Sequence, residues 1–210
     1  MTALTVIMSA RLSSYPNAPE NHVAKFHRAL HSFLESQVSD PVELIVASDG
    51  CDKVDREWDV FRSEMGCFDE EVVVGEKTLR HIRIEKTTSW YGAARNAAIE
   101  CARGRLIAYL DSDDMVTPSH FADIITSMGD HDWIWFDYLH WPEVLVKAEI
   151  KEGRCGTCTI AHVSSLPIRW CDAYAADWKF ISDARVAYPN YAYRPIGGYI
   201  VCHIPGVLDV

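Results

Sequence analysis

The first half of the chain alternates short β-prone blocks with longer amphipathic or alanine-rich segments. The short blocks are too brief for helices and are bounded by turn residues, which is typical of strands in a buried sheet. They are residues 5–8, 42–47, 81–84 and 106–110. Between them we expect helices over 21–37, with Asn21 as the N-terminal cap, and over 91–103, which Gly104 would end. Strands and helices in this order predict a parallel sheet with helices on its faces.

The second half of the chain is less regular. The elements expected there are a helix over 118–128 capped by Thr117, β-prone stretches within 132–141 and 144–165, and a helix over 171–181. Neither a repeat, nor a low-complexity tract, nor a linker interrupts this order. We therefore expect one domain over residues 1–210, composed of the regular half 1–128 and the less regular half 129–210.

Composition narrows the class of protein. The 210 residues are 49% hydrophobic and 24% charged, as in a folded globular chain, and 20 basic against 30 acidic residues leave a net charge of −10. An acidic chain repels phosphate backbones, so a nucleic acid partner is not expected. The apolar runs are far shorter than the ~20 residues of a membrane span, and the N-terminus lacks the basic segment of a signal peptide. An odd, dispersed set of seven cysteines suits reduced thiols, so we expect a cytoplasmic location.

Three carboxylates follow the buried block 106–110 on a single short turn: Asp111, Asp113 and Asp114. The carboxyl ends of parallel strands meet at one edge of a sheet, so this turn should lie beside the residues that follow the first two strands. Like charges so close repel each other, and a divalent cation such as Mg²⁺ or Mn²⁺ would relieve the repulsion while it bridges to a diphosphate. The alternative is a solvated acidic turn that caps the following helix.

The wider pattern around this turn is more specific. The strings GAARN, ARG and LIAYLDSDD stand in this order between residues 92 and 114, and their spacing resembles the donor-binding signature of the family-2 glycosyltransferases. The likeness extends upstream to LIVASDGCD at 44–52 and TVIMS at 5–9, so that it covers residues 4–128. It implies the GT-A fold: an α/β domain with a Rossmann-like, mainly parallel sheet, helices on both faces and a smaller acceptor-side segment.

The resemblance implies roles for residues at the carboxyl ends of the strands. Asp49 would accept a hydrogen bond from the base of the nucleotide, most often uracil, with Ser9 and Arg11 in the same pocket. Asp111 would face the ribose, and Asp113 would bind the Mn²⁺ or Mg²⁺ ion on the diphosphate. An acidic chain needs a local positive charge to bind an anionic diphosphate, and a metal ion held by Asp113 would supply it.

Three positions on the donor side are ambiguous or unusual. The resemblance places Arg95 at the donor, whereas an arginine on a helix also favours an ion pair with a neighbouring carboxylate. The Pro-Thr-Tyr-Asn type of turn that usually follows the first strand is replaced by SARL at 9–12. Ser48 stands where the second-strand motif usually has its first acid, which leaves Asp49 as the sole carboxylate to read the base.

Inverting transfer requires a carboxylate that takes the proton from the acceptor hydroxyl. The family places this base in a Glu-Asp pair on a helix after the sheet, and Asp177 stands where that pair is expected, with Ala176 in place of the first acid. Asp172 and Asp183 are nearby alternatives. His203 resembles the histidine that several family members add as a metal ligand, although a lone histidine is more often structural.

Two further patterns lie in the second half. Cys155 and Cys158, with His162 and Cys171 downstream, suggest zinc ligands, but a second pair at comparable spacing is missing, which favours free thiols. Trp178 stands beside the expected base and is suited to stacking on the acceptor.

The sequence thus predicts a metal-dependent hexosyltransferase that moves sugar, with inversion, from a nucleotide-sugar donor, most often a UDP-sugar, to a saccharide or lipid-linked hydroxyl acceptor. Residues 1–128 would bind the donor, and residues 129–210 would hold the acceptor and the base. Two alternatives stay open. A sugar-phosphate nucleotidyltransferase usually has a Gly-rich, basic first loop, which 9–14 lacks, and a non-catalytic sugar-nucleotide-binding module is favoured by Ala176 and the short second half.

Overall fold

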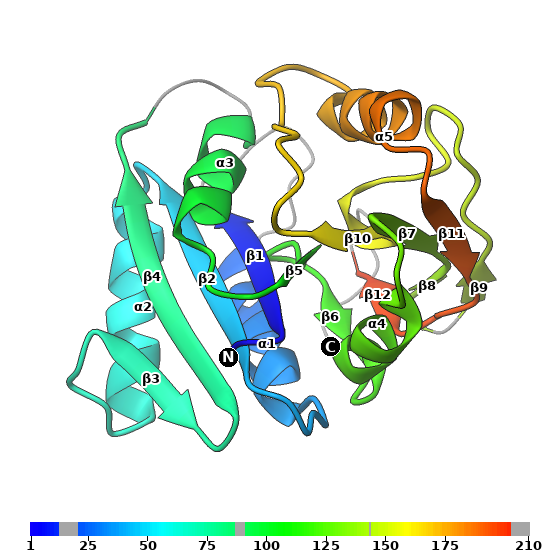
Figure 1. The fold of residues 1–210 in the computed structure, drawn as a ribbon. Coiled ribbons are helices and arrows are strands. Elements are labelled where there is room, and N and C mark those ends of the chain that lie inside the picture. The colour runs from blue at the N-terminus through cyan, green and yellow to red at the C-terminus, as the bar shows by residue number, and fades with distance from the viewer. Residues whose placement is uncertain (13–20, 87–90, 143, 203–210) are drawn as a thin grey trace.

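The computed structural model describes residues 1–12, 21–86, 91–142 and 144–202 (Figure 1). The elements of the first half are β1 (Leu4–Ala10), α1 (His22–Glu35), β2 (Val42–Asp49), α2 (Asp52–Glu64), β3 (Glu71–Val74), β4 (Lys77–Ile84), α3 (Gly92–Cys101), β5 (Leu106–Tyr109), β6 (Met115–Val116) and α4 (His120–Met128). Those of the second half are β7 (Trp133–Phe136), β8 (Tyr138–His140), β9 (Val144–Val146), the 3₁₀ turn η1 (Thr157–Thr159), β10 (Ile160–Val163), α5 (Ala176–Ala187), β11 (Tyr191–Arg194) and β12 (Tyr199–Val201).

The strands form two sheets. The eight-stranded sheet has the order β11-β7-β10-β5-β1-β2-β4-β3, and the four-stranded sheet has the order β6-β12-β8-β9. β5, β1, β2 and β4 are parallel to their neighbours within this group, as the alternation of strands and helices predicts. β10 runs antiparallel to β5 and to β7, so the sheet becomes mixed where the second half of the chain joins it.

Helices cover both faces of the large sheet (Figure 1). On one face, α1, α2 and α4 pack against a core that includes Val6 and Met8 of β1. On the other face, α3 and α5 pack against a core that includes Ile7, because successive side chains of a strand point to opposite faces. β1, β2 and β5 are therefore buried at every position, as their mostly apolar sequences predict.

Several boundaries and elements differ from those that the sequence predicts. α2 and β3 were not expected at all, and α5 begins at Ala176 rather than at residue 171. Helix α4 begins at His120, with Ser119 rather than Thr117 at the cap position. Gly104 does not end α3, whose last residue is Cys101. Position 104 requires glycine for another reason, because a Cβ there would lie 2.4 Å from the backbone nitrogen of Thr5 on β1.

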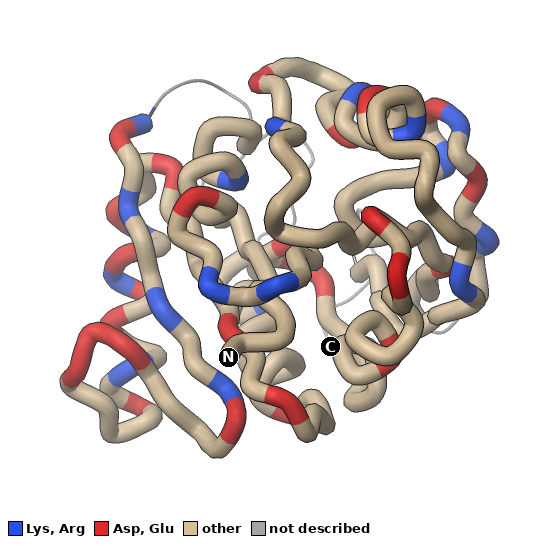
Figure 2. The backbone as a smooth tube through the Cα atoms, viewed as in Figure 1, with Lys and Arg blue, Asp and Glu red and all other residues tan. Residues whose placement is uncertain are grey.

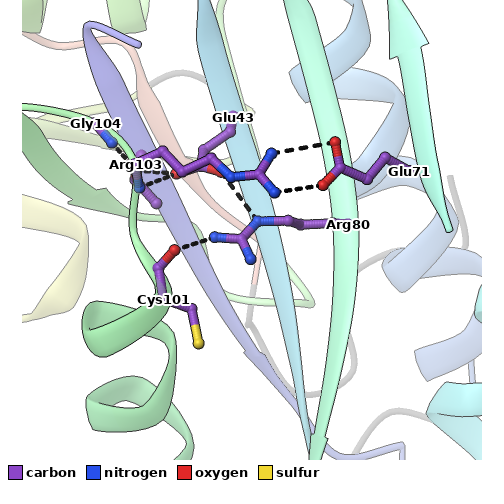
Figure 3. A network of polar contacts seen from close by, with 7 residues as sticks. Glu43, Glu71, Arg80, Cys101, Arg103 and Gly104 are labelled. Carbon is purple, nitrogen blue, oxygen red and sulfur yellow. Dashed lines mark hydrogen bonds and ion pairs between the residues drawn. The ribbon is translucent and has the colours of Figure 1, made fainter. Parts of the chain in front are cut away.

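A polar network links several strands of the large sheet near their amino ends, opposite to the carboxyl ends that line the cavity (Figure 3). Glu43 of β2 is 1% exposed and accepts hydrogen bonds from Thr5 Oγ1 and Arg103 N, each at 2.5 Å, and from Arg80 Nε at 3.0 Å. Arg103 also pairs with Glu71 of β3 at 2.6 Å. This network links β1, β2, β3 and β4 to the loop after α3.

Charge is spread over the whole molecule. Figure 2 shows acidic and basic positions interspersed along both halves of the backbone, within a chain whose net charge is −10. Over the described ranges, none of the helices combines the length and the apolar character needed to cross a lipid bilayer.

Candidate active site

A cavity of about 800 Å³ opens at the carboxyl ends of β1 and β5. Seven segments line it: the end of β1 with the residues after it, the first turns of α1, the start of α3, the acidic turn after β5, the loop that leads into η1, the start of α5 and the end of β12. Their lining residues include Ser9, Arg11, His22, Lys25, Tyr91, Arg95, Asp111, Asp113, Asp114, Thr157, Asp177 and Trp178. Both halves of the chain therefore contribute to one cavity.

The residues expected to meet the base of a nucleotide lie together. Asp49 ends β2, is 1% exposed and forms an ion pair with the Arg11 guanidinium. Ser9 and Arg11 line the cavity, whereas Asp49, which pairs with Arg11, is not part of the lining. The sequence correctly brings these three side chains to one place.

Asp111 is held by three neighbours. Its Oδ1 lies 3.2 Å from Arg95 Nη2, its Oδ2 accepts a hydrogen bond from the Thr157 hydroxyl at 2.9 Å, and its backbone N–H donates to the Tyr199 hydroxyl at 2.9 Å. These contacts come from α3, η1 and β12, so the first acid of the turn is fixed by elements far apart in the sequence.

Asp114 is the buried member of the acidic turn. It is 4% exposed and accepts hydrogen bonds from the Tyr199 hydroxyl at 3.0 Å and from Cys202 N at 2.7 Å. Burial raises the pKa of Asp114 well above its usual 3.8, and the charges of Asp113 and Asp111 raise it further. The turn therefore concentrates negative charge that a cation would offset.

Asp113 is the residue of this turn that the sequence predicts as the ligand of a divalent cation. It lines the cavity, and its carbonyl oxygen accepts a hydrogen bond from Arg28 at 3.0 Å. Within the described ranges no group of three or more His, Cys, Asp or Glu side chains is arranged to enclose a metal ion. Carboxylate oxygens still fit Mg²⁺ or Mn²⁺, since such ions are commonly bound by one or two carboxylates together with the phosphate oxygens of a substrate.

Asp177 lies in the first turn of α5 and lines the same cavity. Burial raises the pKa of its carboxyl above the usual 3.8, and Asp111 raises it further, while Arg95 and the backbone N–H of Thr157 lower it. The preceding Ala175 has φ 57°, a left-handed conformation that non-glycine residues rarely adopt. Such strain is found mainly where a function requires the local geometry, and here it precedes the helical turn that carries Asp177.

Arg95 links the two sides of the cavity. Its guanidinium is 3.2 Å from Asp111 and 3.5 Å from Asp177, and it lies over the Trp170 ring at 4.6 Å. The residue is 7% exposed. The ion-pair interpretation of Arg95 is therefore confirmed, and its partners are two acids of the site.

The alternatives for the base lie outside the lining of the cavity. Asp183 pairs with Lys179 at 2.7 Å on the exposed side of α5, and Asp172 is exposed. Trp178 lines the cavity beside Asp177. His203, expected as a metal ligand, lies outside the described residues.

The zinc interpretation of the cysteine motif is wrong. Cys155 and Cys158 line the cavity, but His162 is buried and uses both ring nitrogens, one with the Tyr109 hydroxyl at 2.8 Å and one with the Val163 carbonyl at 2.9 Å. The CGTC segment matters for another residue, Thr157, which holds Asp111.

Sequence reasoning missed three residues of this site: Lys25, Thr157 and Tyr199. Thr157 stands within a motif interpreted for its thiols, and Tyr199 lies on β12, four residues before His203. Lys25 occupies a core-facing position of an amphipathic helix, between Val23 and Phe26. A charged residue at such a position was the available signal.

Comparisons with known proteins show the family and the fold of the chain. The family model described as Glycosyl transferase family 2 matches residues 21–138. The Bacillus subtilis (strain 168) protein EpsH is 32% identical over 97 residues, which are 46% of this chain and 25% of EpsH.

Solved structures share the fold over nearly the whole chain. S. aureus TarS 1–349 in complex with UDP-GlcNAc superposes with a TM-score of 0.72 at 15% identity, covering 98% of this chain and 60% of that one. The mannosyltransferase PcManGT from Pyrobaculum calidifontis, in complex with GDP-Man and Mn²⁺, has a TM-score of 0.66 at 13% identity and covers 97% and 57%. This chain thus spans between 25% and 60% of the length of these relatives. It belongs to glycosyl transferase family 2 and has the GT-A fold.

Proposed function

We propose that the chain transfers a glycosyl unit from a nucleotide-sugar donor to a hydroxyl acceptor. The observation that carries the proposal is the convergence of Asp111, Asp113 and Asp177 on one cavity at the carboxyl ends of the parallel strands. Membership of glycosyl transferase family 2 supports it, as do a structural relative in complex with UDP-GlcNAc and another with GDP-Man and Mn²⁺.

The donor would bind with its nucleotide at the end of β1. Ser9 and Arg11 offer polar groups to the base, and Asp49 fixes the Arg11 guanidinium through its ion pair. Asp111 would accept a hydrogen bond from the ribose, since Arg95 and Thr157 hold its carboxylate in place. A uridine nucleotide is the proposed donor, and residues 1–128 supply most of these contacts.

Asp113 would hold Mn²⁺ or Mg²⁺ on the diphosphate, and His203 stays a prediction as a further ligand. When bound, the cation supplies positive charge that stabilises the departing diphosphate. These ligands fit such ions, because hard cations prefer oxygen ligands. Burial is the main cause of the raised pKa of the neighbouring Asp114, and the charges of Asp113 and Asp111 add to it, so a cation would offset negative charge here.

Asp177 would act as the base. Its carboxylate takes the proton from the acceptor hydroxyl as that oxygen bonds to the anomeric carbon, and the bond from this carbon to the diphosphate breaks on the opposite face, which inverts the configuration. A pKa raised by burial improves a carboxylate as a base. The acceptor, a saccharide or lipid-linked hydroxyl, would lie on the 129–210 side of the cavity, with Trp178 available for stacking.

The test compares donor binding and donor turnover. Thermal denaturation with a panel of nucleotide sugars, with and without Mn²⁺, should identify a ligand that stabilises the wild-type protein, and calorimetry should then give its affinity. Asp113→Asn should remove the effect of Mn²⁺ on that affinity. Asp177→Asn should leave donor binding intact and reduce transfer by at least roughly a hundredfold, the usual contribution of a general base.

The outcomes separate the proposal from its alternatives. Binding without transfer to any hydroxyl acceptor or to water would support a binding module instead. Full metal-dependent turnover by Asp113→Asn would overturn the metal assignment, and undiminished transfer by Asp177→Asn would remove Asp177 from the role of base.

A further inference from the structure

Lys25 is a buried cation on the wall of the cavity. It lies on α1, is 2% exposed and belongs to the lining. Its ammonium has three N–H donors, and within the described part of the chain it donates one hydrogen bond, a long one of 3.4 Å to the Cys202 carbonyl oxygen. A lysine is almost never this buried without an anionic partner, because removing its charge from water is costly. The unused donors indicate a ligand.

The acids of the neighbouring turn are not the missing partners. Asp114 already accepts hydrogen bonds from the Tyr199 hydroxyl and the Cys202 N–H, and Asp111 is held from other elements. Lys25 forms no ion pair with any described carboxylate. Its charge therefore remains available to something that enters the cavity.

Helix α1 presents a basic edge to this part of the cavity. His22 and Lys25 both line it and are three residues apart, so they share one face of the helix. Arg28, a further three residues on, donates to the Asp113 carbonyl oxygen at 3.0 Å, so this face reaches the acidic turn. The N-terminus of the 14-residue α1 also carries the positive end of the helix dipole. A buried ammonium beside a helix N-terminus suits an anion.

We propose that Lys25 binds a phosphate oxygen of the donor's diphosphate. The inference rests on the nucleotide-sugar donor proposed above, and it gives the chain a fixed positive charge in addition to the cation on Asp113. When the bond between the anomeric carbon and the diphosphate oxygen breaks, the electron pair stays on that oxygen. Lys25 donates a hydrogen bond to the diphosphate and keeps its proton. Part of the affinity for the diphosphate is then independent of metal.

The test is the affinity for a nucleoside diphosphate relative to its nucleoside. Calorimetry compares UDP with uridine, and GDP with guanosine, for wild type and Lys25→Met in Mn²⁺ and in EDTA. The methionine removes the charge and keeps an unbranched side chain. We expect diphosphate binding to weaken roughly ten- to a hundredfold in both conditions, with nucleoside binding unchanged, because a charge-assisted hydrogen bond is lost. Lys25→Arg should retain most of the affinity.

Lys147→Met is the matched control, since Lys147 is exposed and does not line the cavity, and its UDP affinity should equal that of wild type. An equal preference for the diphosphate in wild type and Lys25→Met overturns the inference and leaves the donor proposal intact. So does a lowered melting temperature of Lys25→Met with that preference unchanged, which would make Lys25 a structural residue. If wild type prefers neither diphosphate to its nucleoside, the donor proposal is itself wrong. Should Lys25→Met not fold, Lys25→Gln serves the same comparison.

Discussion

Thr157 donates its hydroxyl hydrogen to Asp111 Oδ2 at 2.9 Å, across 46 positions of the sequence. Its backbone N–H also lowers the pKa of Asp177, and the residue is 4% exposed. Thr157 therefore holds the carboxylate of an acid at the end of the sheet and influences the titration of an acid on α5. Arg95 pairs with both of these acids, so it links the end of the sheet to α5 across the cavity.

Thr157→Val should preserve the shape of the side chain and lower activity. Asp111 Oδ2 loses its donor, and its position relative to Asp177 is less restrained. We expect kcat/KM for transfer to fall roughly tenfold, the effect of one hydrogen bond to a charged group. Part of this fall should be a lower kcat rather than only a higher KM, because the geometry of the reacting groups is affected.

Thr157→Ser is the control for this positioning role, because it retains the hydroxyl and should restore most of the activity. Steady-state kinetics well below the melting temperature make the comparison. Equal losses in the serine and valine variants, or a valine variant with wild-type kcat/KM, would contradict the role.

Asp177 should control the acid side of the pH profile. A base must be deprotonated, and burial raises the pKa of Asp177 above 3.8, so kcat/KM should fall on acidification at a higher pH than for an exposed aspartate. Arg95 lowers this pKa, so Arg95→Gln should move the acid limb to higher pH. Asp111 raises it, so Asp111→Asn should move the limb to lower pH. Profiles of kcat/KM against pH for the three proteins, measured while each stays folded, provide the check. If Arg95→Gln and Asp111→Asn moved the acid limb in the same direction, Asp177 would not be the group whose protonation sets that limb.

The first half of the fold could be predicted because its patterns are local. The blocks that became β1, β2 and β5 are apolar on both faces, and Asn21 does precede α1. α2 escaped prediction because only Val54, Trp58 and Phe61 face the core, while most of the helix is charged. These three apolar residues have helical spacing, but they are too few among the charged residues to predict a helix.

The residues of the candidate site also fall into those that the sequence could predict and those that it could not. The acids 111–114 could be found because they follow one another directly after a strand. Lys25 and Thr157 could not, because each acts through a segment remote in the sequence: Lys25 contacts Cys202, 177 positions away. The start of α5 was misplaced because a left-handed Ala175, which no propensity favours, precedes the helix.

Two buried histidines should make the fold sensitive to acid. Burial lowers the pKa of His120 to about 3 and that of His162 to about 4, from the usual 6.5. Below pH 6.5 these two histidines become protonated in the unfolded chain but stay neutral in the folded chain. The free energy of unfolding therefore falls as the pH drops towards 4. Each histidine contributes about 1.4 kcal/mol per pH unit across this window.

The two histidines differ in their hydrogen bonds, which provides a matched pair of variants. His162 contacts the Tyr109 hydroxyl and the Val163 carbonyl, whereas neither ring nitrogen of His120 has a partner in the described part of the chain. His120→Leu should therefore keep or raise the free energy of unfolding at pH 7.5 and reduce its fall towards pH 5. His162→Leu should lower it by about 1–3 kcal/mol at pH 7.5. Urea denaturation at both pH values gives these quantities, and an unchanged pH dependence in His120→Leu would show that its titration is not coupled to folding.

Glu43 should be far more costly to neutralise than Glu71, although both pair with an arginine. Glu43 is 1% exposed and accepts hydrogen bonds from Thr5, Arg80 and the Arg103 N–H, so an amide nitrogen at this place would face a donor. Glu43→Gln should lower the free energy of unfolding by about 3 kcal/mol. Glu71 pairs with Arg103 on the surface, where side chains are 34% and 51% exposed, so Glu71→Gln should cost less than about 1 kcal/mol. Urea denaturation at pH 7.5 measures both. This network lies at the end of the sheet opposite the cavity, so Glu43→Gln should bind UDP as tightly as wild type under conditions in which the variant is folded. If the two substitutions lowered the free energy of unfolding equally, the buried carboxylate of Glu43 would not stabilise this end of the sheet.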